Sequence, residues 1–561
     1  MSKPLSRAAF LGLKTSKKQI VTEVSPIPRG LISDLEEYKG VWGKVQAAHL
    51  IRRTMFGATK TEINFLSTMS MSQAVDLLLK DVPNPPEPVN DYNGAGEDKL
   101  VDKVVPFGQP WASLPTRDFD IEFWKNVSLK CWWFNNIIEQ KYSIQEKMLL
   151  FWQNHLPIQV FEVYDARLSY KYLTTLRQHC LGNFKSMTRA VTIDPAMLFY
   201  LNGTYNVKSA PDENYARELQ ELFCIGKGPD SKYTEDDVKA AARILTGWKS
   251  DWQKPNTFFV ANDHDTNDKH FSSFYKNKII KGATGANAGN EELDALLNLV
   301  FANSECAKHI VRKLYRFFVY HTIDAKTEMD IIIPLADLFQ ASNYDIKTVM
   351  NKLLKSAHFY DKLNRGAVLK TPLDYTLGML REYNMPKPAK TNLKEMFWVR
   401  TGMYWWIRDM LLDIGDPPNV AGWPAWYQSP QFDKYWISTN TLPKRGNLSD
   451  AMIYWGFENE DKSIKYGIDE FAFTKNLDNP ADPELLVEEV LNLFFSISVN
   501  VQVKASLKSI LLSGQAQNYY WTNAWNDYIA NPNDMMKKDI VKWRLKAFYQ
   551  HVMQMEEYQL M

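Results

Sequence analysis

The chain has 561 residues, of which 45% are hydrophobic and 23% are charged, and its formal net charge at pH 7 is +1. These values are typical of a large globular protein and exclude an intrinsically disordered chain. The balanced charge gives no basic field that would attract nucleic acid or an anionic membrane, so no nucleic-acid partner is expected. No stretch is long and apolar enough to cross a bilayer, so we expect a soluble protein without a membrane span.

The N-terminal segment, residues 1–44, is predicted to form an extended arm. The sequence around Arg7 is similar to a twin-arginine export signal, but the second arginine is missing and lysines follow in place of an apolar region. Without an intact signal, the sequence favours a cytoplasmic location. The alternative is a periplasmic or envelope-associated protein.

Helical periodicity fills most of the remaining chain. Residues 45–80 predict two or three short helices, and the proline- and glycine-rich segment 82–98 predicts a loop or linker. Helical patterns then continue with one lapse. We predict an all-α fold with a large helical body over residues 45–445 and a C-terminal helical extension over 446–561 packed on it.

The first helical pattern contains one histidine and two arginines. His49 lies in the apolar stretch AAHLIRRTMFG, where a hydrogen-bonded core histidine is the expected role. Arg52 and Arg53 follow about one helical turn later. They could bind an anion, or they could pair with helix carboxylates.

The stretch from Ser209 to Trp248 predicts two helices joined by a glycine turn. Ser209 with Asp212, and Thr234 with Asp237, have the spacing of capping boxes. Gly226 and Gly247 are the expected helix ends. This helical hairpin has the densest set of polar residues that could point inward, so we expect it to organise the site.

Three polar residues of the first helix recur at helical spacing. Asn214, Glu218 and Glu221 are predicted to share one face, and Arg217 can pair with Glu221. One interpretation is a structural network of ion pairs. The other is that Glu218 and Glu221 are metal ligands or an acid and a base, with Asn214 and Arg217 contacting substrate.

Two histidines extend this hypothesis to a metal site. His155 closes the FWQNH stretch at a predicted helix end, and His179 lies in LRQHCLGNF. If the fold brings them close to Glu218 and Glu221, the four side chains suit a divalent metal ion. The four cysteines are too widely spaced for zinc-ribbon or haem-attachment patterns, and no nucleotide-binding or iron–sulfur pattern is present.

The helical pattern lapses between Trp248 and Asn290. Alternation around Phe258–Val260 and Ile279–Ile280 predicts a small β-hairpin inserted in the helical body. Its loop carries His264 and Asp265, a second candidate site, since functional residues concentrate on loops held by rigid elements. The alternative is a solvent-exposed polar loop.

A proline-rich loop, DPPNVAGWPAWYQ, carries Trp423 and Trp426. Aromatic side chains on a loop could stack on a sugar ring. They could equally close the helical core, and this interpretation is favoured because large aromatic residues are buried on average.

Six segments carry a family resemblance: AAHLIRRTMFGAT, FWQNH, LRQHCLGNF, NYARELQELFCIG, YTEDDVKAAARILTGW and PPNVAGW. With them, the chain resembles the bacterial family catalogued as domain of unknown function 1800. The resemblance implies a mainly helical protein, often exported and often encoded beside a sulfatase-like partner, without an accepted catalytic mechanism. His264 and Asp265 stand where the family usually shows a His–Asp pair.

The leading functional hypothesis is a hydrolase-like enzyme that uses a metal or a carboxylate–histidine site on an envelope polymer or polysaccharide. Its residues would be Glu218, Glu221, His264 and Asp265 for catalysis, His155, His179, Glu218 and Glu221 for the metal, and Asn214, Arg217, Trp423 and Trp426 for substrate. The alternative is a non-catalytic accessory or scaffold protein that works with a sulfatase-like partner. An enzyme requires these residues to converge in a concave pocket.

Overall fold

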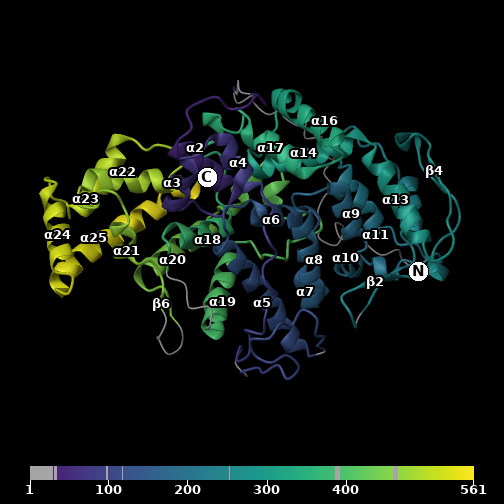
Figure 1. Cartoon of the computed structure of the whole chain (residues 1–561), viewed down its shortest axis with the longest axis horizontal. Coiled ribbons are helices and arrows are strands. Elements are labelled where there is room, and N and C mark those ends of the chain that lie inside the picture. Colours follow the sequence, from purple (N-terminus) through teal and green to yellow (C-terminus); the bar gives the residue numbers. More distant parts are fainter. Residues whose placement is uncertain are drawn as a thin grey trace, which may run out of the picture.

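The computed structural model describes residues 30, 34–96, 99–116, 118–251, 253–385, 392–458 and 465–561. Helices dominate these ranges, which confirms the predicted fold class (Figure 1). Most of the predicted N-terminal arm, residues 1–29 and 31–33, lies outside the described residues. Across the described ranges, no helix combines the length and the apolar composition needed to cross a membrane.

The N-terminal half of the body surrounds one central helix. Helix α6 (Gln145–His155) is buried along its whole length, as expected of a helix packed on all sides. The helices of this half are α2 (Lys44–Thr54), α3 (Lys60–Ser67), α4 (Met71–Leu78), α5 (Phe119–Ile138), α6, α7 (Val160–Val163), α8 (Ala166–His179), α9 (Phe184–Thr192) and α10 (Pro195–Tyr200).

Charged residues of α6 are buried with their partners. Glu146 pairs with Arg177 of α8, and Lys147 pairs with Asp374. A buried charge without a partner would be very costly, so these two pairs fix how α6 sits among its neighbours.

The second half of the body continues with helices that are interrupted by two π-helical segments. They are α11 (Asn214–Glu218), π-helix η2 (Leu219–Cys224), α12 (Glu235–Ile244), α13 (Ala288–Phe301), α14 (Ser304–Phe318), α15 (Ala325–Thr327), π-helix η5 (Glu328–Ile332), α16 (Ile333–Ala341), α17 (Ile346–Lys355), α18 (Pro372–Glu382) and α19 (Leu393–Asp409). Short 3-10 turns connect several elements: η1 (Gly203–Tyr205), η3 (Ala261–Asp263), η4 (Ser273–Tyr275), η6 (Lys362–Asn364), η7 (Pro424–Trp426), η8 (Phe432–Trp436) and η9 (Glu556–Gln559).

The predicted helical hairpin is present, but only one of its two predicted capping boxes forms. Thr234 and Asp237 form the expected capping box at the start of α12, and Gly226 and Gly247 take the left-handed conformation at the two helix ends. The capping box predicted at Ser209 is wrong. Helix α11 begins only at Asn214, because the Asp212 carboxylate accepts from the Asn214 backbone N–H and turns the chain there.

The strands also pair differently from the predicted β-hairpin. The predicted strand segments exist, but they do not pair with each other. Within the described residues there are three two-stranded antiparallel sheets, each pairing consecutive strands. They are β1 (Trp248–Ser250) with β2 (Thr257–Phe259), β3 (Lys269–His270) with β4 (Ile279–Ile280), and β5 (Phe457–Glu458) with β6 (Lys465–Tyr466).

The C-terminal helices form one end of the molecule, and the last residues return to the body (Figure 1). The backbone N–H of Lys370 donates to the Gln559 carbonyl, and that of Met561 donates to the Val368 carbonyl. The helices of this part are α20 (Thr441–Tyr454), α21 (Glu470–Lys475), α22 (Pro483–Phe494), α23 (Val501–Leu511), α24 (Tyr519–Ala530) and α25 (Met535–Gln554).

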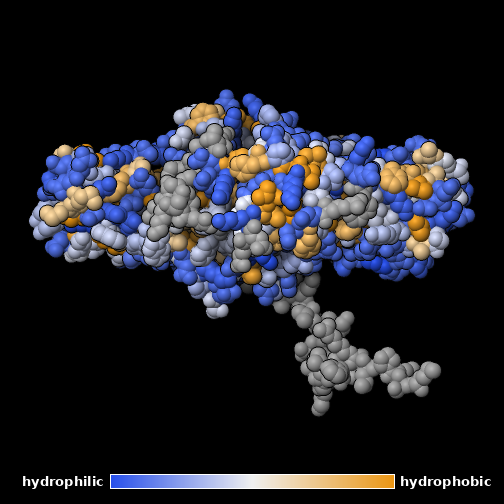
Figure 2. All heavy atoms as spheres, turned by 90° about the horizontal axis from the view of Figure 1, so that it is seen from below, coloured by the Kyte–Doolittle hydropathy of each residue, from blue (hydrophilic) through white to orange (hydrophobic). Residues whose placement is uncertain are grey.

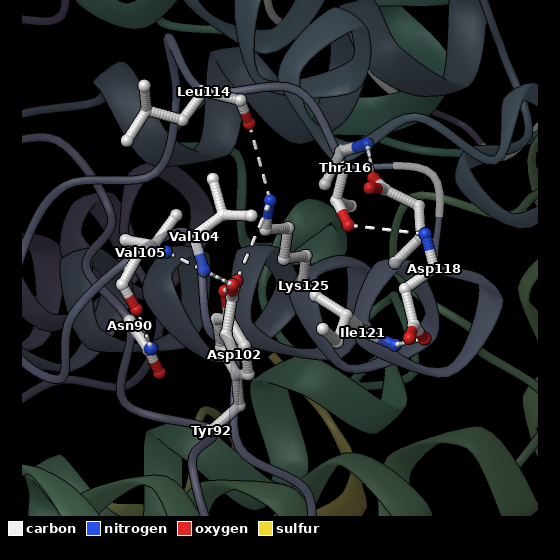
Figure 3. Close-up of polar contacts among 12 residues, drawn as sticks. Asn90, Tyr92, Asp102, Val104, Val105, Leu114, Thr116, Asp118, Ile121 and Lys125 are labelled. Atoms are coloured by element: carbon white, nitrogen blue, oxygen red, sulfur yellow. Dashed lines mark hydrogen bonds and ion pairs between the residues drawn. The ribbon is translucent and has the colours of Figure 1, made fainter.

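The described part of the proline-rich segment, residues 82–96, is a loop, and the chain from residue 99 onward is held against α5. Figure 3 shows Asp102 accepting hydrogen bonds from the Tyr92 hydroxyl at 2.7 Å and from the backbone N–H groups of Val104 and Val105 at 2.8 and 3.0 Å. Lys125 of α5 lies 3.9 Å from the same carboxylate. This buried network gives the loop a defined position, so it can form the wall of a pocket.

The turn after α2 contacts α18 backbone to backbone. Gly57 has a φ of +72°, and a Cβ atom added there would lie 2.7 Å from the Cα of Gly378. Only glycine fits both the conformation and the distance.

We expect Gly57→Ala to lower the free energy of unfolding by about 2–4 kcal/mol, because it adds backbone strain and a clash with α18. The measurement is urea denaturation followed by circular dichroism. Gly446→Ala is the matched control: this glycine lies inside α20, an added Cβ would lie 3.9 Å from its nearest neighbour, and alanine should be neutral or stabilising. Equal stability of Gly57→Ala and the wild type would contradict the close contact.

Candidate functional site

The C-terminal end of α6 is where four of the family-like segments meet. Trp152 donates its indole N–H to the Cys180 carbonyl at 2.9 Å, and His155 Nε2 donates to the Phe223 carbonyl at 2.9 Å. Asn154 accepts a hydrogen bond from the Trp423 backbone N–H at 2.8 Å. Side chains of a single helical turn thus hold three distant parts of the chain.

His155 belongs to a cluster around the π-helix η2. His309 Nε2 lies 2.9 Å from the Leu222 carbonyl, and Lys313 Nζ lies 3.3 Å from the same oxygen. Lys313 also contacts His155 Nδ1 at 3.0 Å. Because His155 Nε2 donates to a carbonyl, its Nδ1 carries the lone pair that accepts from Lys313. Both ring nitrogens of His155 are therefore engaged within the protein.

Burial sets the protonation of this cluster. It lowers the pKa of His155 far below its usual value, and the charge of Lys313 adds to the effect. It also lowers the pKa of His309 to about 3 and that of Lys313 to about 7. The two imidazoles are therefore neutral donors to helix carbonyls at neutral pH.

The other predicted metal ligands form no hydrogen bond, ion pair or ring contact with His155 in the described part of the chain, although Glu221 belongs to η2 itself. The rings in contact with His155 belong to Phe151, Trp152, Phe184, Phe223 and His309, and not to His179. Glu221 pairs with Lys227, whereas one buried oxygen of Glu218 has no hydrogen-bond partner. Burial and the charge of Glu221 raise the pKa of Glu218.

Within the described ranges, no group of three or more His, Cys, Asp or Glu side chains is placed to hold a metal ion. A divalent metal bound by His155, His179, Glu218 and Glu221 stays a prediction. Metal content measured on protein purified without a metal-affinity tag tests it directly.

Arg217 does not pair with Glu221 as predicted. Its guanidinium binds Glu213 at 2.9 Å and Glu235 at 2.7 Å, and so links α11 to the first turn of α12. Glu221 does not pair with Arg217 because it forms an ion pair with Lys227 instead. Asn214 lies exposed at the start of α11.

His264 and Asp265 lie in a second network of charges. Hydrogen bonds from Arg243 at 2.8 and 3.1 Å and from the Asn267 N–H oppose the desolvation of Asp265 and hold its pKa at about 2. His264 Nδ1 lies 3.0 Å from the Thr246 carbonyl. His264 Nε2 lies 3.2 Å from Glu292, whose second oxygen lies 2.5 Å from Lys269 Nζ. The contacts join the loop to α12 and α13, which favours a structural role over a reactive one.

Trp423 and Trp426 pack at the base of the core. Trp423 is 1% exposed, and its ring meets that of Trp426 at a centroid distance of 5.7 Å. Trp426 in turn packs on Phe317 and Trp436. Trp423 is thus part of the core and offers no face to a sugar, whereas Trp426 is only partly buried and its predicted contact with substrate stays a prediction.

A pocket of about 550 Å³ lies between the proline-rich loop and the helices α5, α6, α8 and α19. Pro83, Pro85 and Pro86 line the loop side. Trp132 of α5 lines the helix side and donates its indole N–H to the Pro86 carbonyl at 2.7 Å. The volume is within the range of pockets that bind small ligands, roughly 300–1,000 Å³.

Polar groups without partners gather in this pocket. Asn136 Nδ2, both amide atoms of Gln140, Gln145 Oε1 and Arg177 Nε are buried, line the pocket and have no hydrogen-bond partner among the described residues. Buried polar atoms in native proteins nearly always have a partner. Their concentration around one pocket makes this pocket the candidate binding site.

The pocket also contains a carboxyl group with an unusual pKa. Asp91 accepts a hydrogen bond from the Ser128 hydroxyl at 2.6 Å, and burial raises the pKa of Asp91 to about 7. Arg400 lies nearby and donates to Asn135. Glu146 is held by Arg177 and by the Trp133 indole at 3.1 Å. At neutral pH, Asp91 can therefore donate as well as accept, whereas Glu146 is a fixed anchor.

The sequence profile of the family described as protein of unknown function (DUF1800) matches residues 49–560. The chain is a member of this family. The match includes the segment predicted as a C-terminal extension, 446–561, almost to its end. No curated protein and no solved structure matches this DUF1800 chain.

The pattern of residues in this DUF1800 protein did not mark the pocket residues as functional. Asn136 is an ordinary polar residue near the end of α5, and Gln140 is one that follows that end, where polar residues are common. Asp91 lies in a segment predicted to be a linker. Arg177 was visible only as part of LRQHCLGNF. Their common pocket arises from the loop that folds back over α5.

The buried imidazole of His309 should make the free energy of unfolding decrease at acidic pH. Its pKa is about 3 in the folded protein against 6.5 in the unfolded chain, so the unfolded state binds more protons between these values. Stability is therefore lost as the pH falls from about 6.5 towards 3. His309→Gln, which can still donate to the Leu222 carbonyl, should lose less free energy of unfolding between pH 7 and pH 5 than the wild type.

The measurement is urea denaturation at both pH values. His551→Gln is the control, because His551 is exposed on α25. An equal pH-dependent loss in the wild type and His309→Gln would contradict the role of the buried imidazole.

Proposed function

We propose that this DUF1800 protein binds a saccharide unit of an envelope polymer or polysaccharide in the pocket between loop 82–91 and α5. The concentration of unpartnered amide and guanidinium groups around this one pocket supports the proposal. Amide side chains donate and accept at once, as neighbouring sugar hydroxyls do. Trp132 supplies the apolar surface on which a sugar ring can pack.

This role agrees with the accessory-protein alternative and with a polysaccharide as the bound partner. Of the residues predicted to be catalytic, Glu221 pairs with Lys227, His264 contacts Glu292, and Asp265 pairs with Arg243. None of these residues lines the pocket, and neither does Glu218. On the face shown in Figure 2, hydrophobic residues form separate patches among hydrophilic ones. A sulfatase-like partner protein, a metal cofactor and the compartment stay predictions.

Hydrolysis of the bound saccharide is a second candidate, supported by Asp91. A carboxyl group with a pKa of about 7 is protonated for half of its population at neutral pH, as a general acid requires. The second carboxylate of a glycosidase would have to be free to act as base or nucleophile. Glu146 does not offer this, because Arg177 and Trp133 hold it, which leaves Glu87 and Glu139 as the other carboxylates of the pocket. Binding without cleavage is the leading proposal, because the unpartnered polar groups support binding directly.

We expect Gln140→Leu and Asn136→Leu each to weaken binding of the recognised oligosaccharide about five- to tenfold, because each removes hydrogen bonds while keeping the side-chain size. Isothermal titration calorimetry with a panel of soluble envelope and plant oligosaccharides measures this effect. Gln502→Leu, at an exposed position of α23, is the matched control and should bind as the wild type does. Absence of binding across the panel, or unchanged binding by both pocket variants, would overturn the proposal.

Asp91→Asn separates binding from hydrolysis. The amide keeps the shape and the contact with Ser128 but cannot deliver a proton. If the protein only binds, the variant should retain affinity within about threefold, and neither protein should release new reducing ends. If Asp91 is a general acid, wild type alone cleaves the bound oligosaccharide and the variant loses at least about 100-fold in rate.

A further inference from the structure

A second pocket, of about 170 Å³, lies where α2 meets α22, the loop after it and α23. It is lined by His49 and Arg52 of α2, by Arg365, and by Ser496 and Lys504 from the C-terminal part. Since one water occupies about 30 Å³ in the liquid, this volume suits a small anion or the head of a larger ligand. The pocket is separate from the saccharide pocket and shares no lining residue with it.

The charge of Arg52 is buried without a carboxylate partner. Arg52 is 3% exposed, and its terminal nitrogens donate only to neutral oxygens: Leu493 O at 2.6 Å, Phe495 O at 3.3 Å and Ser496 Oγ at 3.2 Å. Its Nε has no partner in the described part of the chain. Carbonyl contacts satisfy N–H groups but do not neutralise a charge, and the carboxylate whose charge acts on Arg52, that of Glu382, forms no ion pair with it among the described residues.

Arg365 adds a second uncompensated cation. Its backbone N–H donates to the Lys362 carbonyl, but its guanidinium forms no hydrogen bond or ion pair with the described residues, and it lies at the pocket wall. Gly366 beside it has a φ of +62°, and a Cβ added there would lie 2.6 Å from Ile497 Cγ2, so this loop contacts the chain of the opposite wall. Lys504 is paired with Glu488 at the same pocket. The lining therefore carries a net excess of two positive charges.

The protonation state of His49 restricts which anions can bind in this pocket. Its Nε2 lies 3.0 Å from the Phe359 carbonyl, so this nitrogen carries the proton and Nδ1 carries a lone pair. Nδ1 is buried and has no partner within the described ranges. Burial, and next the charge of Arg53, lower the pKa of His49 well below its usual value, so the ring stays neutral. A ligand that fits must offer negative oxygens to the arginines and a proton to His49.

We propose that this pocket binds a phosphate group, inorganic or as a phosphomonoester, with its anionic oxygens on Arg52, Arg365 and Ser496 and its remaining hydroxyl donating to His49 Nδ1. A phosphomonoester keeps a proton for part of the time near neutral pH, because its second pKa is about 6. Inorganic phosphate has one more hydroxyl and therefore always keeps at least one proton in this pH range. Sulfate has the same shape and charge range but no such proton. This binding function is independent of saccharide recognition.

The test is a titration with inorganic phosphate, followed by isothermal titration calorimetry and by thermal melting, with sodium sulfate and sodium chloride added at matched ionic strength. We expect phosphate to bind and to raise the melting temperature more than sulfate or chloride. Arg365→Gln should weaken phosphate binding at least about tenfold. Lys362→Gln, an exposed lysine of the same loop that does not line the pocket, is the charge-matched control and should bind phosphate as the wild type does.

Ser496→Ala provides a second, milder variant and should weaken phosphate binding several-fold even if Arg365→Gln proves unstable. Equal effects of phosphate and sulfate would overturn the assignment of a protonated phosphate. Absence of phosphate binding to the wild type, or unchanged binding in both variants, would overturn the site itself. A phosphomonoester that binds more tightly than inorganic phosphate would identify the group as the head of a larger ligand.

Discussion

The structure depends on satisfying charges inside a helical core. Helix α6 is buried along its whole length, although it carries Glu146 and Lys147 near its beginning and Asn154 and His155 at its end. Arg177 and Asp374 neutralise the first two residues, and backbone groups of other segments bind the last two. Because an unpaired buried charge costs several kcal/mol, these partners restrict the fold to one arrangement of the surrounding helices.

The same rule separates structural networks from candidate binding sites. Around η2 and around Glu292, most of the histidines, lysines and carboxylates contact groups of the chain itself, which favours a role in stabilising the fold. In the pocket beside α5, several amide and guanidinium atoms lack any partner. In the pocket beside α2, two guanidinium groups lack a counter-charge. The missing hydrogen bonds and the missing charge point to a neutral polyhydroxyl ligand in one pocket and an anion in the other.

The sequence predicted that Glu218 and Glu221 lie close together, but it did not predict the partners of these residues. The spacing of Glu218 and Glu221 suggested a shared face, and the two carboxylates do interact, as the raised pKa of Glu218 shows. However, a π-helix begins at Leu219 and Lys227 binds Glu221. A π-helix changes the angular spacing of side chains, and a lysine from the following turn competes for the carboxylate. Neither effect can be predicted from residue spacing alone.

The sequence by itself determined the helical class, the capping box at Thr234, the glycine ends at Gly226 and Gly247, and the membership of the DUF1800 family. These features depend on local periodicity, local backbone conformation or ordered motifs, all of which are written in consecutive residues. Only the tertiary structure decided that the loop 82–91 folds over α5, that His155 faces a helix carbonyl, and that Arg52 and Arg365 line one pocket. Such contacts join residues that are tens to hundreds of positions apart. They follow from the packing of the whole core, which local pattern does not specify.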